Sequence, residues 1–125
     1  MGWFSFGNKE GDSEKLNWIK LNEVSQLDEI EKRSNEQPVI IFKHSTRCSI
    51  SAMALNRVET NWQINPEEAD VYFLDLLAYR PISNEIESKF GVEHQSPQVL
   101  VIKDGQCTYS ASHNQIDPRT LKKQL

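Results

Sequence analysis

The feature that most constrains the fold is a short apolar run, Val39 to Phe42, followed directly by the stretch Lys43–Ser51. The run has no polar alternation and is rich in β-branched residues, which predicts a central strand covered on both faces. Apolar residues at helical spacing come next and predict a helix that reaches about Trp62. The expected inward stripe of that helix is Ile50, Met53, Ala54 and Val58. Cys48 therefore falls in the turn from a buried strand into a helix.

A thiol at the start of a helix meets unpaired backbone N–H groups and the positive end of the helix dipole, and both favour an anion. The thiolate is the form of cysteine that attacks sulfur, so we predict that Cys48 is a redox nucleophile. Arg47 and Lys43 would add positive potential, and the hydroxyls of Ser49 and Ser51 could donate hydrogen bonds to the thiolate. The alternative is an inert, buried cysteine.

The rest of the chain predicts the element order β-α-β-α-β-α-β-β-α. Strands are expected at 18–21, 39–42, 71–76, 98–102 and 107–110, and helices after Ser25, across 50–62, across 80–90 and after Asp117. The first of these helices should turn Val24, Leu27 and Ile30 inward. Early strands separated by helices favour parallel pairing, and the Asp104-Gly105 turn favours an antiparallel hairpin at the edge. The fold class is therefore α/β, with a central mixed β-sheet and helices on both faces.

Length, net charge and cysteine content limit the classes of function that suit this chain. The chain has 125 residues, which suits one hydrophobic core, and a net charge of −4, which argues against nucleic acid as the main partner. No apolar run approaches the ~20 residues that span a bilayer. The segment Met1–Gly7 lacks the basic start and long apolar core of a secretory signal. With only two cysteines, we expect free thiols in a reducing cytoplasm.

The second cysteine and the histidines give weaker signals. Cys107 lies in a strand of the late hairpin, and we predict a structural role, with a slow resolving or modifiable thiol as the alternative. His44 is open to a structural or an acid–base role, and His113 precedes the last helix. The spacing of these residues lacks the close Cys or His pairs of zinc sites, so no metal is expected.

The first residues form an expected flexible N-terminal tail, residues 1–17, ahead of a domain at 18–125. The stretch Gly7–Lys15 of this tail is polar and glycine-bearing, and three aromatic residues, Trp3, Phe4 and Phe6, precede it. These aromatics are interpreted as a short segment laid over a groove of the same domain, with a weak contact to a partner or a membrane as the alternative.

Three features of the chain occur together: the cysteine in a strand-to-helix turn, the Ser96-Pro97 pair before a core strand, and the hairpin at Gly105. This combination resembles the thioredoxin fold, in which a cis proline faces the active cysteine, and the resemblance covers residues 18–125. An X–Pro bond is the only peptide bond that adopts the cis form at low cost. The resemblance implies that Pro97 is cis and that the backbone beside it pairs with an extended disulfide substrate.

A finer match lies in four segments, Lys43–Ser51, Arg80–Asn84, His94–Gln98 and Ser112–Ile116. They resemble the YtxJ family of monothiol bacilliredoxins, glutaredoxin-like proteins that use bacillithiol in place of glutathione. The family's nucleophile falls on Cys48, and its C-x-x-S arrangement ends at Ser51. The chain departs from the family at Ser49, where members often carry proline.

The resemblance implies a monothiol thiol-disulfide oxidoreductase that removes bacillithiol from mixed disulfides on proteins. Its partners would be bacillithiolated proteins and bacillithiol, which acts as a thiol co-substrate, with no tightly bound cofactor. The implied substrate- and bacillithiol-binding residues are Thr46, Arg80, Ser96 and Pro97. Arg80 suits a carboxylate of the malate group in bacillithiol, because a guanidinium binds carboxylates through two hydrogen bonds; a solvated charge is the alternative.

Two other functions stay open. One is a glutaredoxin-like iron–sulfur cluster carrier, in which one thiolate per subunit and a small thiol hold a cluster between two subunits. That class prefers Cys-Gly-Phe-Ser, and Ser49-Ile50 breaks the pattern. The other is a non-catalytic interaction module of the same fold, which would keep its binding after Cys48→Ser.

Overall fold

The computed structural model describes residues 16–125. The three aromatic residues of the predicted tail, Trp3, Phe4 and Phe6, lie outside the described residues. Of the two described residues assigned to the tail, Leu16 packs against the apolar core, as Trp18 also does. Trp18 also donates a hydrogen bond from its indole Nε1 to Glu59, at 3.1 Å.

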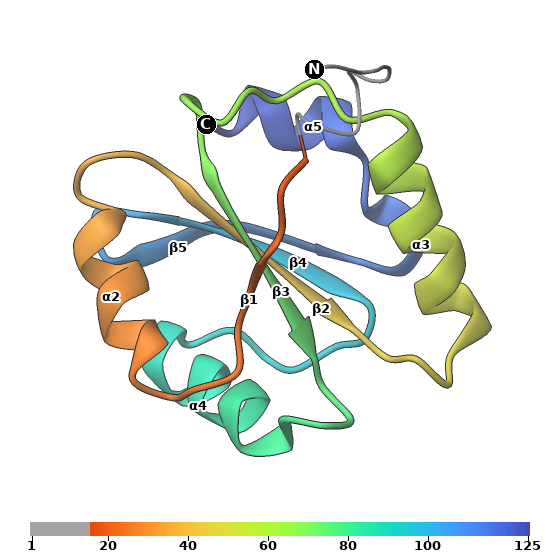
Figure 1. Cartoon of the computed structure of the whole chain (residues 1–125), viewed down its shortest axis with the longest axis horizontal. Coiled ribbons are helices and arrows are strands. Elements are labelled where there is room, and N and C mark those ends of the chain that lie inside the picture. Colours follow the sequence, from red (N-terminus) through yellow and green to blue (C-terminus); the bar gives the residue numbers. More distant parts are fainter. Residues whose placement is uncertain (1–15) are drawn as a thin grey trace, which may run out of the picture.

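The elements follow the predicted order (Figure 1). They are β1 (Ile19–Lys20), α2 (Gln26–Arg33), β2 (Val39–His44), α3 (Ser49–Thr60), β3 (Asp70–Asp75), α4 (Arg80–Phe90), β4 (Gln98–Lys103), β5 (Gln106–Ser112), a short 3-10 turn (His113–Gln115) and α5 (Pro118–Lys123). The five strands form one sheet in the order β1-β3-β2-β4-β5. β1, β3 and β2 run parallel, whereas β4 and β5 run antiparallel to their neighbours. The predicted mixed sheet is confirmed.

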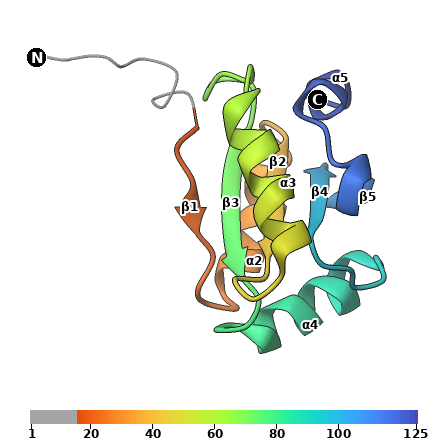
Figure 2. The ribbon, with the colours of Figure 1, turned by 90° about the vertical axis from the view of Figure 1, so that its right-hand side faces the viewer.

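Helices cover both faces of the sheet (Figures 1 and 2). On one face α3 and α5 pack against one set of strand side chains, through residues such as Ala54, Val58 and Leu121. On the other face α2 and α4 pack against the alternate set, through Leu27 and Ile86. Each face therefore has its own apolar core, with β2 buried along its whole length between them.

Two of the predicted helix faces are partly wrong. Val24 lies before α2 and is 49% exposed, because the helix begins only at Gln26. In α3, Ile50 and Met53 are 53% and 66% exposed, whereas Ser51, Ala54 and Val58 are buried. The buried stripe therefore runs along 51, 54 and 58, and the large apolar side chains at the start of α3 face solvent.

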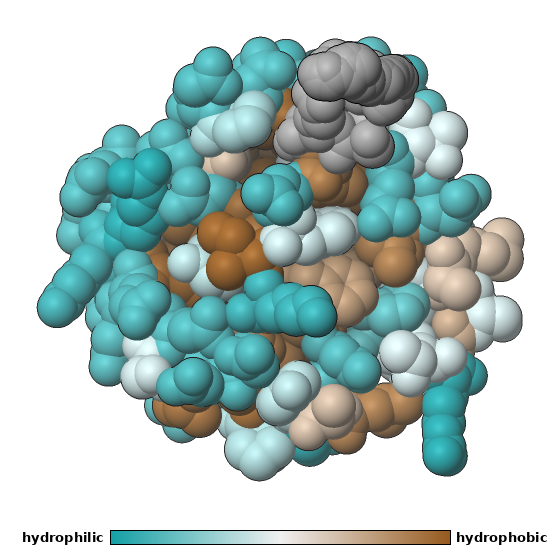
Figure 3. Space-filling view, viewed as in Figure 1, coloured by the Kyte–Doolittle hydropathy of each residue, from teal (hydrophilic) through white to brown (hydrophobic). Residues whose placement is uncertain are grey.

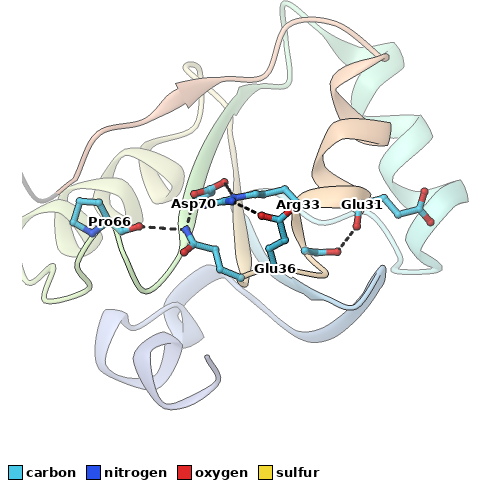
Figure 4. A network of polar contacts seen from close by, with 7 residues as sticks. Glu31, Arg33, Glu36, Pro66 and Asp70 are labelled. Carbon is cyan, nitrogen blue, oxygen red and sulfur yellow. Dashed lines mark hydrogen bonds and ion pairs between the residues drawn. The ribbon is translucent and has the colours of Figure 1, made fainter.

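The end of the sheet where β3 begins is fastened by polar contacts (Figure 4). Arg33, at the end of α2, contacts Asp70 at 2.8 Å and Glu36 at 3.0 Å. Gln37 bridges Asp70 and the carbonyl of Pro66 at 2.7 and 3.2 Å. The face seen in Figure 3 is mostly hydrophilic, with hydrophobic atoms at the surface over β1 and β3. Within the described residues, no helix is long and apolar enough to cross a membrane.

The two sheet edges are irregular. β1 has two residues, and the pairing of β5 with β4 changes register between Val101 and Ile102. Between these edges, β2 and β3 run parallel and finish at the same end of the sheet, with His44 opposite Asp75. Because α3 follows β2 and α4 follows β3, this end brings together the predicted turn and the start of α4.

Candidate active site

Cys48 occupies the N-cap position of α3, as the sequence predicts. Its backbone N–H donates to the carbonyl of Ser45 at 3.2 Å, which closes a tight turn after β2. Its own carbonyl accepts the first helical hydrogen bond, from Ala52, at 3.1 Å. The residue is half-buried. The thiol is therefore carried on a fixed backbone at the positive end of a 12-residue helix, where an anion is favoured.

The proline of the Ser96-Pro97 pair has a cis peptide bond, as the resemblance to the thioredoxin fold implies. Pro97 is buried, and its carbonyl accepts a hydrogen bond from the backbone of His113 at 3.2 Å. Lys43 of β2 pairs with Gln98 of β4, so the residues just after β2 and just before β4 lie at the same end of the sheet. The cis proline and the Cys48 turn therefore belong to one site.

Ser51 is fully buried, and its hydroxyl is already engaged. The oxygen accepts a hydrogen bond from the backbone of Ser45 at 3.1 Å and lies 2.8 Å from Nδ1 of His44. A hydroxyl that accepts from Ser45 can give its own hydrogen to the histidine ring. The expected donation to the thiolate therefore competes with two contacts that hold the turn together.

His44 is buried at the end of β2, with its ring centroid 5.5 Å from that of Phe73. Burial lowers the pKa of His44, and the carboxylates of Asp75 and Glu59 oppose this shift more weakly. A lowered pKa keeps the imidazole neutral at neutral pH, so its Nδ1 is free to accept from Ser51. These contacts are those of a structural histidine.

Lys43 is fully buried on the opposite face of the sheet. Its ammonium lies 2.9 Å from Nδ1 of His94 and donates to Oε1 of Gln98 at 3.1 Å. Burial lowers the pKa of Lys43 to about 8; Glu87 acts to raise it and Arg80 to lower it. Among residues 16–125, no hydrogen bond joins this ammonium to Cys48. The ammonium therefore contacts the segment that carries the cis proline, through His94 and Gln98.

The other predicted site residues surround the turn without fixed contacts. Thr46, Arg47 and Ser49 are exposed on the turn itself. Arg80 is exposed at the first position of α4. Ser96 is half-buried, and its hydroxyl has no hydrogen-bond partner among the described residues. The exposed side chains of Thr46, Arg47, Ser49 and Arg80 are therefore available to a ligand. The hydroxyl of Ser96 is itself buried.

The sequence analysis did not single out Arg57, and it placed His113 only as a residue before the last helix. Arg57, on α3, donates to the carbonyls of Ile116 and His113 at 2.9 and 3.1 Å, and so fixes the loop after β5. His113 there has a positive φ of 56°. A hollow of about 270 Å³ lies beside this loop. It is lined by Ile50, Met53, Arg57, His113 and Asn114. The only advance signal was that Ser112–Ile116 and His94–Gln98 match the family's motifs.

Cys107 lies at the other end of the molecule. It faces Ile102 near the β4–β5 hairpin, whereas the site lies at the opposite ends of these strands. Its thiol donates to the carbonyl of Tyr109 at 3.3 Å, and burial raises its pKa. This placement agrees with a structural role. Within residues 16–125, no group of three or more His, Cys, Asp and Glu side chains is arranged to hold a metal ion.

Comparison with known proteins identifies the family to which this chain is similar. The family model described as monothiol bacilliredoxin BrxC matches residues 19–121. A solved structure described as a candidate oxidoreductase with a thioredoxin fold is similar at a TM-score of 0.72 and 27% identity, over 85% of this chain and 91% of that chain.

Two thioredoxins share the fold at lower identity. Mitochondrial thioredoxin 3 from Saccharomyces cerevisiae, in its oxidized form, has a TM-score of 0.63 and 20% identity, over 85% of this chain and 91% of that chain. The thioredoxin Mala s 13 of Malassezia sympodialis has a TM-score of 0.65 and 18% identity, over 86% of both chains. The chain therefore belongs to the monothiol bacilliredoxin family, and it is a thiol-disulfide oxidoreductase with a thioredoxin-like fold.

Proposed function

We propose that this protein removes bacillithiol from mixed disulfides on other proteins, with the Cys48 thiolate as nucleophile. The observation that carries the proposal is the site itself: one half-buried thiol at a helix N-cap, followed three residues later by a buried serine hydroxyl. Membership of the bacilliredoxin family supplies the choice of bacillithiol as the small thiol. A reducing compartment such as the cytoplasm suits this chemistry, because the thiol must be free to react.

In the first step, the Cys48 sulfur attacks the bacillithiol sulfur of the mixed disulfide. The bond between bacillithiol and the substrate sulfur breaks, and the substrate leaves as a thiolate. A new disulfide joins Cys48 to bacillithiol. The step exchanges one disulfide for another, so it needs no outside oxidant or reductant.

The second step needs a thiol from outside the turn. A C-x-x-C enzyme clears its mixed disulfide with its own second cysteine, but position 51 carries serine in this chain. Cys107 lies at the far end of β5 and is not placed to attack. An outside thiolate therefore attacks the Cys48–bacillithiol disulfide, forms a disulfide with bacillithiol and restores the Cys48 thiolate.

Bacillithiol would bind where unoccupied polar groups meet at the turn. We propose Thr46, Ser96 and Pro97 as its contacts beside the thiol, with Arg80 holding a carboxylate of the malate group. Arg47 and Ser49 are the exposed groups of the turn that can reach an anionic sulfur. Ser51 and Lys43 have partners of their own, so we assign them a weaker, indirect influence on the thiolate.

The surroundings of the site suit a protein as the carrier of the bacillithiol. Four large apolar side chains are exposed on α3 and on the loop between β3 and α4: Ile50, Met53, Leu77 and Tyr79. Both elements flank the end of the sheet at which Cys48 lies. A contiguous patch of exposed apolar side chains marks a surface that contacts other proteins, and we propose that these four form such a patch around Cys48.

The test is the intact mass of the protein after mixing with a test protein that carries one cysteine as its bacillithiol mixed disulfide. We expect the wild type to gain one bacillithiol at Cys48 while the test protein loses its own. Cys48→Ser should fold and show neither change, and Cys107→Ser should behave as the wild type. If neither partner changes mass while the fold is intact, the proposal is wrong. Colour in anaerobically purified protein would then favour a cluster carrier.

A further inference from the structure

The 93–98 segment, which carries the cis proline, is held at both of its ends by one buried group. The Lys43 ammonium lies 2.9 Å from the ring of His94 and 3.1 Å from the side-chain oxygen of Gln98. Gln98 also donates from Nε2 to the carbonyl of Glu93 at 3.0 Å, which closes the segment on itself. Lys43 thus contacts residues on either side of the Ser96–Pro97 bond.

Lys43 is itself held in place by the protein core. Lys43 is fully buried in the central strand, and its backbone pairs with Gln98. Ser83, which is fully buried on α4, lies 3.0 Å from the same His94 nitrogen. A cation placed in an apolar interior is expensive unless it is hydrogen-bonded. The contacts that stabilise Lys43 therefore also hold the segment in one place.

The segment has a free backbone edge at the end of the sheet that carries Cys48. Among the described residues, the N–H and C=O groups of Ser96 make no backbone hydrogen bond, while the carbonyl of Pro97 is taken by His113. An extended chain that presents its disulfide to Cys48 can pair with this unpaired peptide group. Such pairing depends on where the segment lies relative to the thiol, and small displacements of a substrate-positioning group cost much of the rate.

We propose that Lys43 is a positioning residue for thiol-disulfide exchange: its ammonium, bonded to His94 and Gln98, sets the place of the Ser96–Pro97 backbone that aligns an extended disulfide substrate with Cys48. The role concerns the part of the substrate beyond the reacting sulfurs. This role does not require bacillithiol, so its test is independent of which small thiol the protein uses. The charged groups that face Lys43 and His94 are Arg80 and Glu87, both on α4.

The test compares two activated disulfides that release the same coloured thione. One is a short peptide whose single cysteine is joined to 2-thiopyridine, and the other is the small, neutral 2,2′-dipyridyl disulfide. In each reaction the Cys48 thiolate attacks a disulfide sulfur, and thiopyridone leaves as Cys48 enters the new mixed disulfide. The small reagent reports the reactivity of the thiol, and the ratio of the two rate constants reports alignment of the peptide.

We expect Lys43→Met to lower the rate constant for the peptide by about tenfold and to leave the rate for the small reagent within about twofold. With the peptide in excess, the limiting rate should fall, because a bound peptide whose disulfide is misaligned reacts more slowly. Lys103→Met, the same substitution at the other end of the sheet in β4, is the matched control and should leave both rates unchanged. Circular dichroism establishes that each variant is folded.

If Lys43→Met fails to fold, a second variant can test the same contact. His94→Leu removes the contact from the half-buried segment and should produce the same selective loss for the peptide. An unchanged ratio of the two rates in the folded variants would overturn the proposal, whatever their thermal stability. An equal loss in both rates would give Lys43 a role at the thiolate instead, and would also overturn it.

Discussion

The two ends of the central sheet differ in the polarity of the side chains that their strands and turns bury. Where β2 and β3 finish, the buried residues include the polar side chains of Lys43, His44, Ser45, Ser51 and Gln98. At the opposite end, where the β4–β5 hairpin turns, the strands bury apolar side chains such as Val39 and Ile102. Ser34 is a buried polar residue there, and the ion pairs of Arg33 are partly exposed. Buried polar groups add little to stability and are costly if unpaired. The apolar end therefore holds the fold, and the polar end shapes the site.

The two cysteines show what this division does to one chemical group. Cys48 lies in a turn at the polar end, at the start of a helix, and is the predicted nucleophile. Cys107 lies near the apolar end, in a strand, where burial raises its pKa and its thiol donates to a carbonyl. We therefore expect the reactivity of each thiol to follow from its backbone position, since the residue type is the same.

The sharpest way to break this comparison is to remove each cysteine in turn. Cys48→Ser should lower the rate of thiol-disulfide exchange by at least about 10³-fold, because a hydroxyl is a far weaker nucleophile than a thiolate. Cys107→Ser should keep the rate within about threefold. Exchange with 2,2′-dipyridyl disulfide, followed by thione release, measures both. A comparable loss in the two variants would end the distinction between the two thiols.

The apolar end can be tested with Ile102→Ala. Ile102 is fully buried, and its truncation leaves a cavity in the core beneath α2 and α4. We expect the free energy of unfolding to fall by roughly 2–5 kcal/mol. Urea denaturation measures this loss. The exchange rate of Cys48 should stay within about twofold wherever the variant is folded, and a large drop would show that the two ends are coupled.

The buried charge at the polar end predicts a dependence of stability on pH. The pKa of Lys43 is lowered from 10.5 to about 8 in the folded protein by burial. Between these values the unfolded chain binds more protons, so the contribution of Lys43 to stability rises as the pH rises. The full difference corresponds to at most roughly 3 kcal/mol.

The check is the free energy of unfolding of the wild type minus that of Lys43→Met, from urea titrations at pH 7.5 and at pH 10. The difference should move in favour of the wild type at the higher pH. Other groups titrate in the same range, but they are common to both proteins and cancel. A difference that does not change with pH would mean that Lys43 is not held in a strongly desolvating place.

The smallest effect is expected for Ser51→Ala. The substitution leaves the N–H of Ser45 without its acceptor and His44 without its partner. We expect a loss of roughly 1–2 kcal/mol in the free energy of unfolding. Ser49→Ala, on the exposed side of the same turn, is the matched control and should change stability by less than about 0.5 kcal/mol. Equal losses of stability in the two variants would contradict a structural role for the Ser51 hydroxyl.

Much of this arrangement could be predicted from local sequence. The unbroken apolar run of β2, the Asp104-Gly105 turn and the cap at Asp117 lie in single short segments, and the structure has each where it was expected. The place of Cys48 in the turn followed from the same local signals. The cis form of Pro97 came from the family resemblance, since a single sequence marks only which bonds can adopt it.

The partners of the buried polar residues could not be predicted in this way. Lys43 looks like a source of charge for the nearby thiol, but alternation along β2 sends it to the opposite face from His44. Its contacts, His94 and Gln98, lie some fifty residues later in the chain. The exposed start of α3 was missed for a similar reason, because apolar spacing does not tell which side of a helix a neighbouring loop leaves open.

The register change between β4 and β5 has a consequence for association between copies. A long, flat edge strand offers a row of unpaired backbone groups on which another chain can build, a common route to aggregation. In this sheet one edge is a strand of two residues, and the other is bent out of register between Val101 and Ile102. Irregular pairing twists a strand and interrupts such a template. We propose that the active site binds extended chains, and the two edges of the sheet give such chains few unpaired backbone groups with which to pair.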